Sequence, residues 1–213
     1  MSSPESAASP RRPAVFLDRD GTLNREVNYL ADPAQFELLP GVADGLARLS
    51  ARGFALVVVT NQSGIARGLL DEATLADIHT RMDEELAPSG VVLDLVLYCP
   101  HHPDLDPGPG QDDLAWTRAR CSCRKPAPGM YVEAIARLGL DPARSWCVGD
   151  SLRDLEAGAT LGIPGVLVRT GKGRAQEALA RERGLEVAVV DDFAAAADTV
   201  LAASPGDIEP NPC

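Results

Sequence analysis

The feature that most constrains the fold of this chain is a regular alternation between short apolar runs and longer amphipathic stretches. The short runs are rich in β-branched residues, as buried parallel strands are, and the longer stretches have the apolar spacing of helices. The alternation predicts an α/β fold in three layers, a Rossmann-like parallel sheet with helices on both faces. The expected strands are residues 14–17, 54–59, 93–98, 146–148, 165–168 and 187–190.

Three of the helices can be placed by the residues at their ends. One begins after Gly41 and stops at Gly53, a residue that readily takes the left-handed backbone of a helix end. A second begins at Asp71, whose carboxylate can accept a hydrogen bond from the first helical turn. A third opens at Pro128, where a missing N–H costs nothing, and stops at Gly139.

The chain of 213 residues suits one well-cored domain, which we expect at residues 13–203. Residues 1–12 and 204–213 are rich in Ser, Pro and charge and are expected to be flexible tails. Residues 100–120 show no periodicity and contain too many Pro, Gly and Asp residues for a helix. We therefore expect a long loop there, and long loops inside compact domains are usually functional.

Charge and hydropathy exclude several classes of partner. A net charge of -11 disfavours broad contact with nucleic acid or an anionic membrane, because like charges repel. The sequence contains neither an apolar run of about 18 residues, which a membrane span needs, nor an apolar secretory stretch near its start. We expect a cytoplasmic monomer with no nucleic acid or membrane partner, in which a few local cations hold any anionic substrate.

Polar residues stand at the ends of three predicted strands. The first strand ends at Asp18, the second at Thr60 and Asn61, and the fourth at Asp150. Any one of these residues is commonly just a turn residue. Ligands of open parallel sheets, however, bind outside the carboxyl ends of the strands, so the residues together predict one shared site.

The first of these strand ends carries two acidic residues in the segment FLDRDGTLN. In an extended backbone Asp18 and Asp20 point the same way, because side chains alternate with a period of two. Two crowded carboxylates repel each other unless a cation or a proton relieves them, which indicates Mg²⁺ and one general acid. Gly21 permits a sharp departure of the chain, and Thr22 can donate a hydrogen bond back to the cluster.

The string DRDGT resembles the DxDGT signature of the haloacid dehalogenase-like superfamily of phosphohydrolases. Thr60 in VVVTNQSG resembles the second motif of that superfamily, and Lys125 in CRKPAPGM resembles the third. Asp150 and Asp154 in VGDSLRDLEAG resemble the fourth. The four motifs follow in the expected order over nearly the whole chain, so the resemblance implies a phosphatase of this fold.

The resemblance also implies the chemistry. Asp18 would attack phosphorus as a nucleophile and form a phospho-aspartyl intermediate. Asp20 would protonate the leaving group and then activate the water that hydrolyses the intermediate. The catalytic Mg²⁺ would be held by Asp18, the backbone carbonyl of Asp20 and Asp150.

The remaining motif residues would surround the transferred phosphate. Thr60, the amide of Asn61 and the ammonium of Lys125 would donate to its oxygens and stabilise the developing charge. Asp154, four residues after Asp150 at the start of a helix, is expected to orient Lys125 or a metal-bound water and not to bind the metal.

Soft metal ligands form two close pairs on either side of the long loop. Cys99-Pro-His101 and Cys121-Ser-Cys123 suit a closed tetrahedral Zn²⁺, which would order a loop that has no core of its own. The pattern alone does not decide between His101 and His102 as the fourth ligand. Cys147 lies in an apolar run and is expected in the core, whereas Cys213 falls in the C-terminal tail.

A narrower resemblance links YCPHHP, CSCRKPAPGM and ALVVVTNQSGIARG to the heptose 1,7-bisphosphate 7-phosphatases and the related histidinol-phosphatases. It implies a phosphatase domain without a large cap domain, in which a zinc-stabilised loop, residues 99–123, partly covers the site. The implied zinc ligands are Cys99, His101, Cys121 and Cys123. The implied substrate contacts are Glu26, Val27, Asn28, Tyr29, Thr60, Asn61, Gln62, Ser63, Arg124, Lys125 and Ser151.

The resemblance implies a phosphorylated sugar substrate, dephosphorylated at position 7 on the way to activated heptose for a surface glycan. Histidinol phosphate is the alternative substrate, but its cationic groups require an anionic pocket, whereas Arg124 and Arg67 favour a second phosphate. A non-catalytic binding module would have lost catalytic residues, and none is lost. Ser151 stands where some heptose phosphatases carry a lysine, so the anomer stays open.

Overall fold

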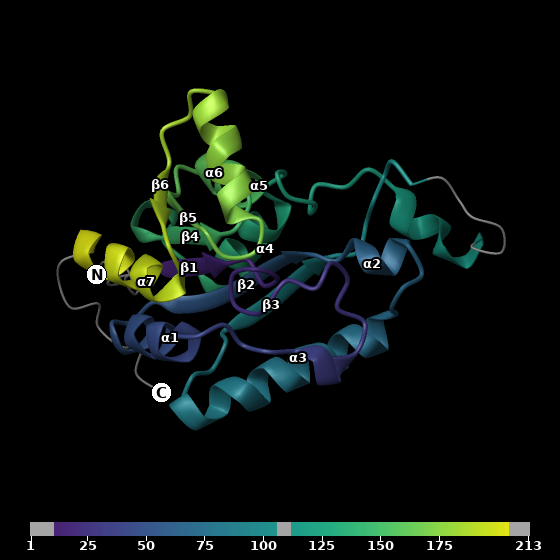
Figure 1. The fold of residues 1–213 in the computed structure, drawn as a ribbon, viewed down its shortest axis with the longest axis horizontal. Coiled ribbons are helices and arrows are strands. Elements are labelled where there is room, and N and C mark those ends of the chain that lie inside the picture. Colours follow the sequence, from purple (N-terminus) through teal and green to yellow (C-terminus); the bar gives the residue numbers. More distant parts are fainter. Residues whose placement is uncertain (1–10, 106–111, 205–213) are drawn as a thin grey trace, which may run out of the picture.

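A computed structural model describes residues 11–105 and 112–204 of the chain (Figure 1). Six strands form one sheet in the order β3-β2-β1-β4-β5-β6, and every neighbouring pair is parallel. The predicted parallel sheet is therefore confirmed. The strands are β1 Ala14–Leu17, β2 Ala55–Asn61, β3 Leu95–Cys99, β4 Trp146–Gly149, β5 Gly165–Val168 and β6 Ala188–Val190.

Helices connect the strands and cover both faces of the sheet. In Figure 1, α1 and α3 lie below the sheet, while α4 and α5 lie above it. Short 3-10 turns at Pro33–Gln35, Ala87–Ser89 and Pro142–Arg144 complete the connections. The α-helices are α1 Val42–Ala51, α2 Ser63–Ala66, α3 Glu72–Leu86, α4 Gly129–Leu138, α5 Leu152–Ala159, α6 Gly173–Glu182 and α7 Phe193–Ala203.

The helix ends follow the local signals of the sequence. The Asp71 carboxylate accepts a 2.7 Å hydrogen bond from the Thr74 N–H, and α3 begins at the next residue after Asp71. Gly53 and Gly139 both have a positive φ, 82° and 63°, just beyond α1 and α4. Pro128 is the N-cap of α4, so the helix begins at Gly129, one residue later than expected.

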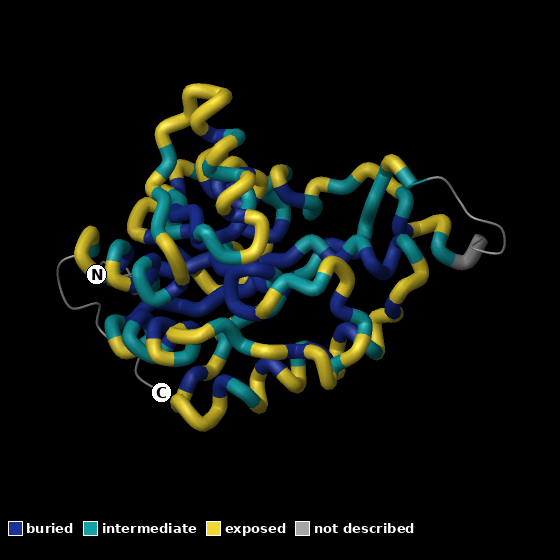
Figure 2. The backbone as a smooth tube through the Cα atoms, in the orientation of Figure 1, coloured by how far each residue is buried: buried dark blue, intermediate teal, exposed yellow. Residues whose placement is uncertain are grey.

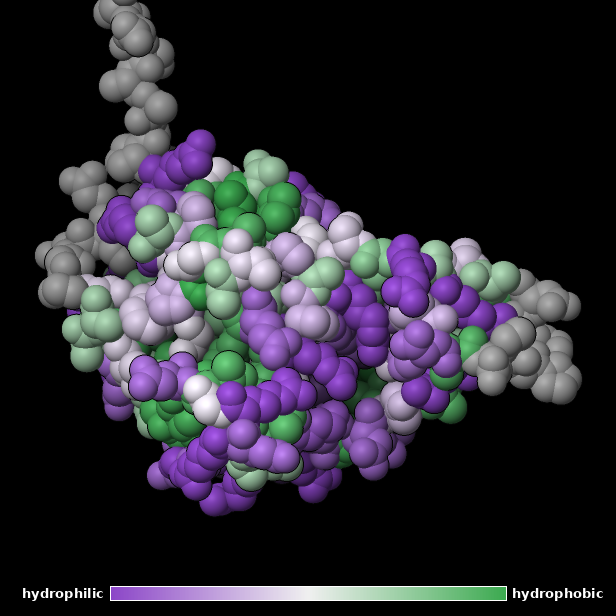
Figure 3. Space-filling view, turned by 90° about the horizontal axis from the view of Figure 1, so that it is seen from above, coloured by the Kyte–Doolittle hydropathy of each residue, from purple (hydrophilic) through white to green (hydrophobic). Residues whose placement is uncertain are grey.

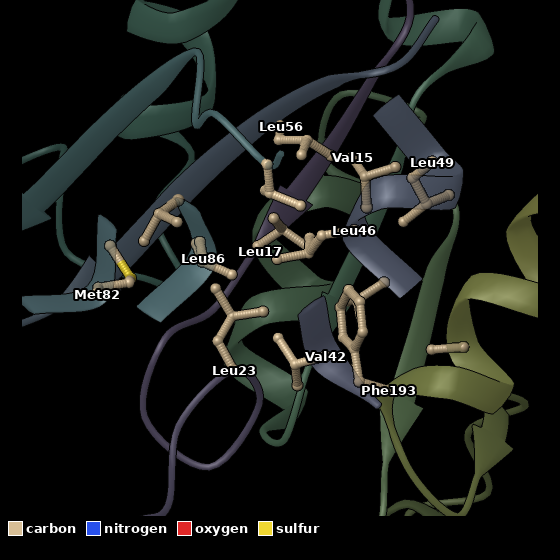
Figure 4. Close-up of a cluster of buried hydrophobic side chains, with 14 of the residues drawn as sticks. Val15, Leu17, Leu23, Val42, Leu46, Leu49, Leu56, Met82, Leu86 and Phe193 are labelled. Atoms are coloured by element: carbon tan, nitrogen blue, oxygen red, sulfur yellow. The ribbon is translucent and has the colours of Figure 1, made fainter. Parts of the chain in front are cut away.

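The core consists of two apolar layers separated by the sheet, and Figure 2 shows the buried central strands between them. Alternate residues of β1 face opposite layers, as a strand buried on both sides requires. Val15 and Leu17 pack with α1, α3 and α7 (Figure 4), where Leu46 and Phe193 lie. On the other face Phe16 stacks on Tyr131 of α4, with ring centroids 4.6 Å apart.

The sheet topology places a crevice at the end of β1. This strand lies between β2 and β4, and the chain proceeds outward from it in both directions. The carboxyl ends of these three strands therefore meet at a topological switch point, where open α/β sheets bind ligands. Asp18, Thr60 and Asp150 stand at those three ends.

Two expectations about the connecting segments need correction. Residues 100–120 are not entirely loop, because a 3-10 helix forms at Asp112–Arg118, with the Thr117 hydroxyl donating to the Leu114 carbonyl at 2.6 Å. Arg12, which we assigned to the N-terminal tail, is fixed: its guanidinium donates to the carbonyls of Gly53 and Phe54. Residues 1–10 and 205–213, including Cys213, lie outside the described residues.

No helix in the described ranges is long and apolar enough to span a membrane.

Candidate active site

A polar cavity of about 430 Å³ lies at the carboxyl ends of the central strands. It brings together residues from widely separated parts of the sequence. On the face seen in Figure 3, hydrophilic side chains gather around the base of the projecting segment after β3. The cavity lining contains the predicted residues Asp18, Asp20, Glu26, Asn28, Tyr29, Thr60, Asn61, Gln62, Ser63, Arg124, Lys125, Asp150 and Ser151.

Val27 is the predicted contact that the cavity lining does not include, and its side chain instead packs against the apolar core. The backbone explains the difference, because Asn28 takes a left-handed conformation with φ 64° and reverses the chain locally. The polar neighbours Glu26 and Asn28 thus reach the cavity, while the aliphatic side chain gains more by leaving water.

Asp18 directly follows β1, and its backbone N–H donates to the Val148 carbonyl of β4 at 3.0 Å. The sheet therefore fixes its position, and only 9% of the residue is exposed. Burial raises the pKa of Asp18 well above its usual value; the nearby charge of Lys125 opposes the increase, whereas Asp154 and Asp150 add to it. A carboxylate that is rigid, poorly solvated and close to a cation is suited to nucleophilic attack.

Lys125 lies between two carboxylates. Its ammonium is 2.7 Å from Oδ1 of Asp18 and 2.7 Å from Oδ1 of Asp154, and it donates to the Val59 carbonyl at 2.6 Å. Burial alone lowers the pKa of Lys125, but the charges of Asp154 and Asp18 outweigh burial and raise that pKa above its usual value. Asp154 therefore orients the lysine, as its spacing predicted.

Asp20 is held by three side chains. Arg19 donates to both of its carboxylate oxygens, Asn24 donates at 3.1 Å, and Gln62 donates at 2.8 Å. Burial on its own would raise the pKa of Asp20, but the Arg19 charge and these hydrogen bonds prevail and hold that pKa below its usual value. Without substrate, Asp20 is accordingly an ionised base.

Thr22 does not make the bond we expected. The residue is fully buried, yet its hydroxyl has no hydrogen-bond partner within the described part of the chain. The acceptor closest in sequence, Asp20, is already occupied by Arg19, Asn24 and Gln62. Thr22 instead contributes its backbone N–H, which donates to the Arg19 carbonyl and closes the turn.

Asp150 ends β4 beside two glycines. A Cβ added to either Gly21 or Gly171 would stand 2.2 Å from Oδ2 of Asp150, so no side chain fits at either position. The same oxygen accepts a 2.8 Å hydrogen bond from the Lys172 N–H. Burial raises the pKa of Asp150 to about 7, although this backbone hydrogen bond opposes the increase.

Two residues at the end of β2, Asn61 and Gln62, have their side chains engaged within the protein. Gln62 bridges the Thr60 hydroxyl and the Asp20 carboxylate through two 2.8 Å bonds. Asn61 donates to the Lys125 carbonyl at 3.0 Å and accepts from the Lys125 N–H at 3.1 Å. These two side chains thus hold Asp20 and Lys125 in place, contacts that the sequence motif did not indicate.

The acidic cluster fits a hard cation. Asp18, Asp150 and Asp154 each offer an oxygen, and these oxygens lie within 4.8 Å of one another. Carboxylate oxygens are the ligands that Mg²⁺ prefers, and the raised pKa values of Asp18 and Asp150 show that their charges are not fully compensated by the protein. Both carboxylate oxygens of Asp154 are engaged, Oδ1 by Lys125 and Oδ2 by the Ser151 N–H. Lys125 engages Oδ1 of Asp18, and no contact of Oδ2 is found among the described residues, so Asp18 and Asp150 are the better placed ligands.

The second cluster fits zinc. Sγ of Cys99 lies 3.6 Å from Sγ of Cys121 and 3.2 Å from Sγ of Cys123, and Nδ1 of His101 lies 3.5 Å and 3.3 Å from Cys99 and Cys123. Ligands on a tetrahedral Zn²⁺ are separated by roughly 3.3–3.8 Å. The structure thereby decides between the histidines, because His102 instead lines the catalytic cavity.

The Cys/His cluster ends two residues before Lys125 in the sequence. The Arg124 guanidinium donates to the His101 carbonyl at 2.9 Å, and the Ser122 carbonyl accepts from the Gly129 N–H at 2.8 Å. The cluster is therefore linked to the segment that carries Lys125.

Sequence reasoning missed Arg19 and Lys172. Arg19 is fully buried beside Asp20, although an arginine between two acidic motif residues was a visible signal. Lys172 pairs with Glu26 at 2.5 Å and lies four residues after β5. The rule that ligands gather beyond the carboxyl ends of parallel strands, applied to β5, would have found it.

Known proteins resemble this chain in sequence and in fold. A family model described as HAD-hydrolase-like matches residues 122–196. The D-glycero-beta-D-manno-heptose-1,7-bisphosphate 7-phosphatase of Escherichia coli O6:H1 is 47% identical over 167 residues, which are 78% of this chain and 84% of that protein.

Solved structures agree with this relationship. The D,D-heptose 1,7-bisphosphate phosphatase of B. bronchiseptica, in complex with magnesium and phosphate, is 41% identical with a TM-score of 0.76, covering 90% of this chain and 99% of that chain. The D,D-heptose 1,7-bisphosphate phosphatase of Burkholderia thailandensis is 36% identical with a TM-score of 0.63, covering 88% and 97%.

The described geometry matches what these relatives imply. An aspartate pair follows β1, and a lysine and further aspartates from distant segments meet it in one polar cavity. Such a constellation hydrolyses phosphate esters through a carboxylate nucleophile. Identity of 47% over most of a relative's length leaves no doubt about common descent. The chain is a HAD-like phosphatase and belongs to the family of the heptose 1,7-bisphosphate 7-phosphatases.

Proposed function

We propose that this chain removes the phosphate at position 7 of D-glycero-β-D-manno-heptose 1,7-bisphosphate. The names of its relatives support both the substrate and the β anomer. One observation carries the proposal: besides the buried Lys125, the cavity is lined by the partly exposed cations Arg67 and Arg124, which we refer to as its rim. A substrate with a second phosphate suits that arrangement.

The rim cations distinguish this substrate from histidinol phosphate. Arg124 and Arg67 line the cavity, and the guanidinium of Arg67 lies 5.5 Å from the ring centroid of Tyr29. The rim carboxylate Glu26 is neutralised by Lys172. A second phosphate would meet favourable charge here, whereas the ammonium and imidazole of histidinol phosphate would be repelled.

The first step is an attack by Asp18 on the phosphorus. A bond forms between its carboxylate oxygen and phosphorus, the bond from phosphorus to the sugar oxygen breaks, and Asp20 donates a proton to that oxygen. Because Arg19 stabilises the ionised form of Asp20, this donation requires that Asp20 carries a proton when the ester is bound.

The second step regenerates the enzyme. Asp20 takes a proton from water, the water oxygen attacks the phosphorus, and the bond from phosphorus to Asp18 breaks to release inorganic phosphate. Lys125 and the groups near Thr60 hold the phosphoryl oxygens in both steps. Asp154 keeps Lys125 in place throughout.

Two metals fit the protein. Asp18, Asp150 and the backbone carbonyl of Asp20 would hold Mg²⁺, which when bound neutralises charge on the phosphoryl oxygens. Cys99, His101, Cys121 and Cys123 would hold a structural Zn²⁺ that orders the segment before Arg124.

The cellular setting is part of the same proposal. The product would enter the synthesis of activated heptose for a surface glycan, and we place the enzyme in the cytoplasm as a monomer. The cluster of Cys99, His101, Cys121 and Cys123 supports the cytoplasmic location, since cysteines of this kind persist as metal ligands in a reducing compartment.

The experiment is a comparison of phosphate release from four substrates: the β and α anomers of heptose 1,7-bisphosphate, heptose 7-phosphate and histidinol phosphate. We expect the highest kcat/KM for the β-bisphosphate. A higher kcat/KM for histidinol phosphate would refute the proposed substrate, and a higher value for the α anomer would refute only the anomer.

A further inference from the structure

Arg153 is a cation at the rim that no sequence motif assigned. It lies in α5, and the residue is exposed. Arg153 and Arg124 both line the catalytic cavity and both line a neighbouring cavity of about 670 Å³. The two guanidiniums thus border the same space from two different segments.

Neither of these arginines forms an ion pair with a carboxylate among the residues described by the structure. The one printed contact of the Arg124 guanidinium is with a backbone carbonyl, that of His101. Burial lowers the pKa of Arg124, and the positive charges of Arg153 and Arg67 lower it further. Like charges held together at a cavity rim favour an anionic ligand between them.

The neighbours of Arg153 in the sequence cannot neutralise it. Asp154 points inward to Lys125 at 2.7 Å and also accepts from the Ser151 N–H at 3.1 Å. The Ser151 hydroxyl contacts Gln176 at 3.5 Å and carries no charge. Arg153 is therefore the cation that α5 offers to this part of the cavity.

We propose that Arg153, acting with Arg124, binds the second phosphate of the sugar bisphosphate and makes the enzyme prefer bisphosphates over monophosphates. This inference rests on the proposed function, because it needs a substrate with a phosphate at each end. Two planar guanidiniums that line the same cavity can each form two parallel hydrogen bonds with a phosphate bound there. The reacting phosphate is held by other groups, so Arg153 affects specificity.

The experiment measures the ratio of kcat/KM for heptose 1,7-bisphosphate to kcat/KM for heptose 7-phosphate. We expect Arg153→Ala to lower this ratio about 10-fold, the effect of losing one charge-assisted contact at an exposed position. Arg153→Lys retains the charge but not the paired geometry and is expected to give an intermediate ratio. The matched control is Arg137→Ala, an exposed arginine of α4 that does not line the cavity, which is expected to keep the wild-type ratio.

A compensating variant tests whether the charge itself matters. Ser151 lines the same cavity, so Ser151→Lys combined with Arg153→Ala returns a cation to this wall. We expect the double variant to recover part of the lost ratio. Thermal melting of each variant confirms that it is folded before the ratios are compared.

The outcomes separate the two proposals. If the wild type prefers the bisphosphate and Arg153→Ala keeps that preference, the role of Arg153 is refuted while the proposed function stands. If Arg153→Ala lowers kcat/KM equally for the bisphosphate and for heptose 7-phosphate, Arg153 does not bind the second phosphate, and the inference is also refuted. A wild type that prefers histidinol phosphate refutes the function, and this inference with it.

Discussion

The ammonium of Lys125 donates a 2.7 Å hydrogen bond to the carboxylate of Asp18, although the two residues are 107 positions apart in the sequence. Asp18 is fixed by β1, whereas Lys125 follows the Cys/His cluster and is clamped through its backbone by Asn61. The alignment of the proposed nucleophile Asp18 with Lys125 therefore depends on both the sheet and the loop. The predictions below test the parts of this arrangement.

We expect Asp18→Asn to abolish turnover, because an amide is a far poorer nucleophile than a carboxylate and a weaker metal ligand. Asp20→Asn keeps the nucleophile but loses proton transfer, which is worth roughly 10²–10⁴-fold in rate. Steady-state phosphate release measures both effects. Activity of Asp18→Asn within tenfold of the wild type would contradict the phospho-aspartyl mechanism.

We expect Asp154→Asn to lower kcat about 10- to 100-fold, since Lys125 loses one of the two charges that hold it while Asp18 and Lys125 themselves are unchanged. KM is expected to change much less. Asp77→Asn, a change at an exposed aspartate of α3, is the control and should leave kcat unaltered. A wild-type kcat in Asp154→Asn would show that Asp18 and Val59 suffice to hold the lysine.

We expect Cys121→Ser to lose bound zinc and to lower the melting temperature, because metal binding orders the segment between Cys99 and Cys123. Elemental analysis and thermal melting measure the two effects. Cys147→Ala is the matched control: this thiol is buried away from the cluster, so zinc should be retained. If wild-type protein purified without chelator carries far less than one zinc per chain, the proposal of a zinc site is wrong.

We expect EDTA to abolish activity and added Mg²⁺ to restore it, since the carboxylates at the ends of β1 and β4 suit a hard cation. Activity assays with each metal after chelation test this. Recovery with Zn²⁺ but not with Mg²⁺ would show that the catalytic metal is misassigned.

We expect Mg²⁺ to stabilise the protein more at about pH 8 than at about pH 5.5. Burial raises the pKa of Asp150 from 3.8 to about 7, so the folded protein binds this proton more tightly than the unfolded chain does. Metal-free protein should therefore lose stability as the pH rises from about 4 towards 7, where Asp150 becomes charged and able to bind Mg²⁺.

Melting temperatures with and without Mg²⁺ across this pH range measure the effect, and Asp150→Asn serves as the control because it cannot titrate. We expect the dependence on Mg²⁺ to be nearly flat in that variant. A Mg²⁺ effect that grows as the pH falls would have the opposite sign and would contradict the assignment of Asp150.

Much of the fold follows from local patterns in the sequence. All six expected strands form, and their ends differ by no more than two residues from the prediction. Strands of a parallel sheet are visible in the sequence as short runs of apolar, often β-branched residues. The cap at Asp71 also lies where its side-chain chemistry predicts. The 3-10 helix at Asp112–Arg118 was missed because it has no apolar periodicity and depends on its own hydrogen bonds.

The chemistry of the site was likewise available from the sequence, since residues at strand ends of a parallel sheet must meet. Asp18, Thr60 and Asp150 required only the strand pattern and the rule for ligand sites. The spacing of Cys99, Cys121 and Cys123 indicated a soft metal in the same way.

Only the tertiary structure decided which side chains are partners. It directs His101 into the thiol cluster and His102 into the cavity, and it pairs Arg19 with Asp20 and Arg153 with no carboxylate among the described residues. The physical reason is that periodicity reports which face a residue occupies. The partner across a cavity depends on how separate segments pack, and contacts of a few ångströms between distant segments are not encoded in any local pattern.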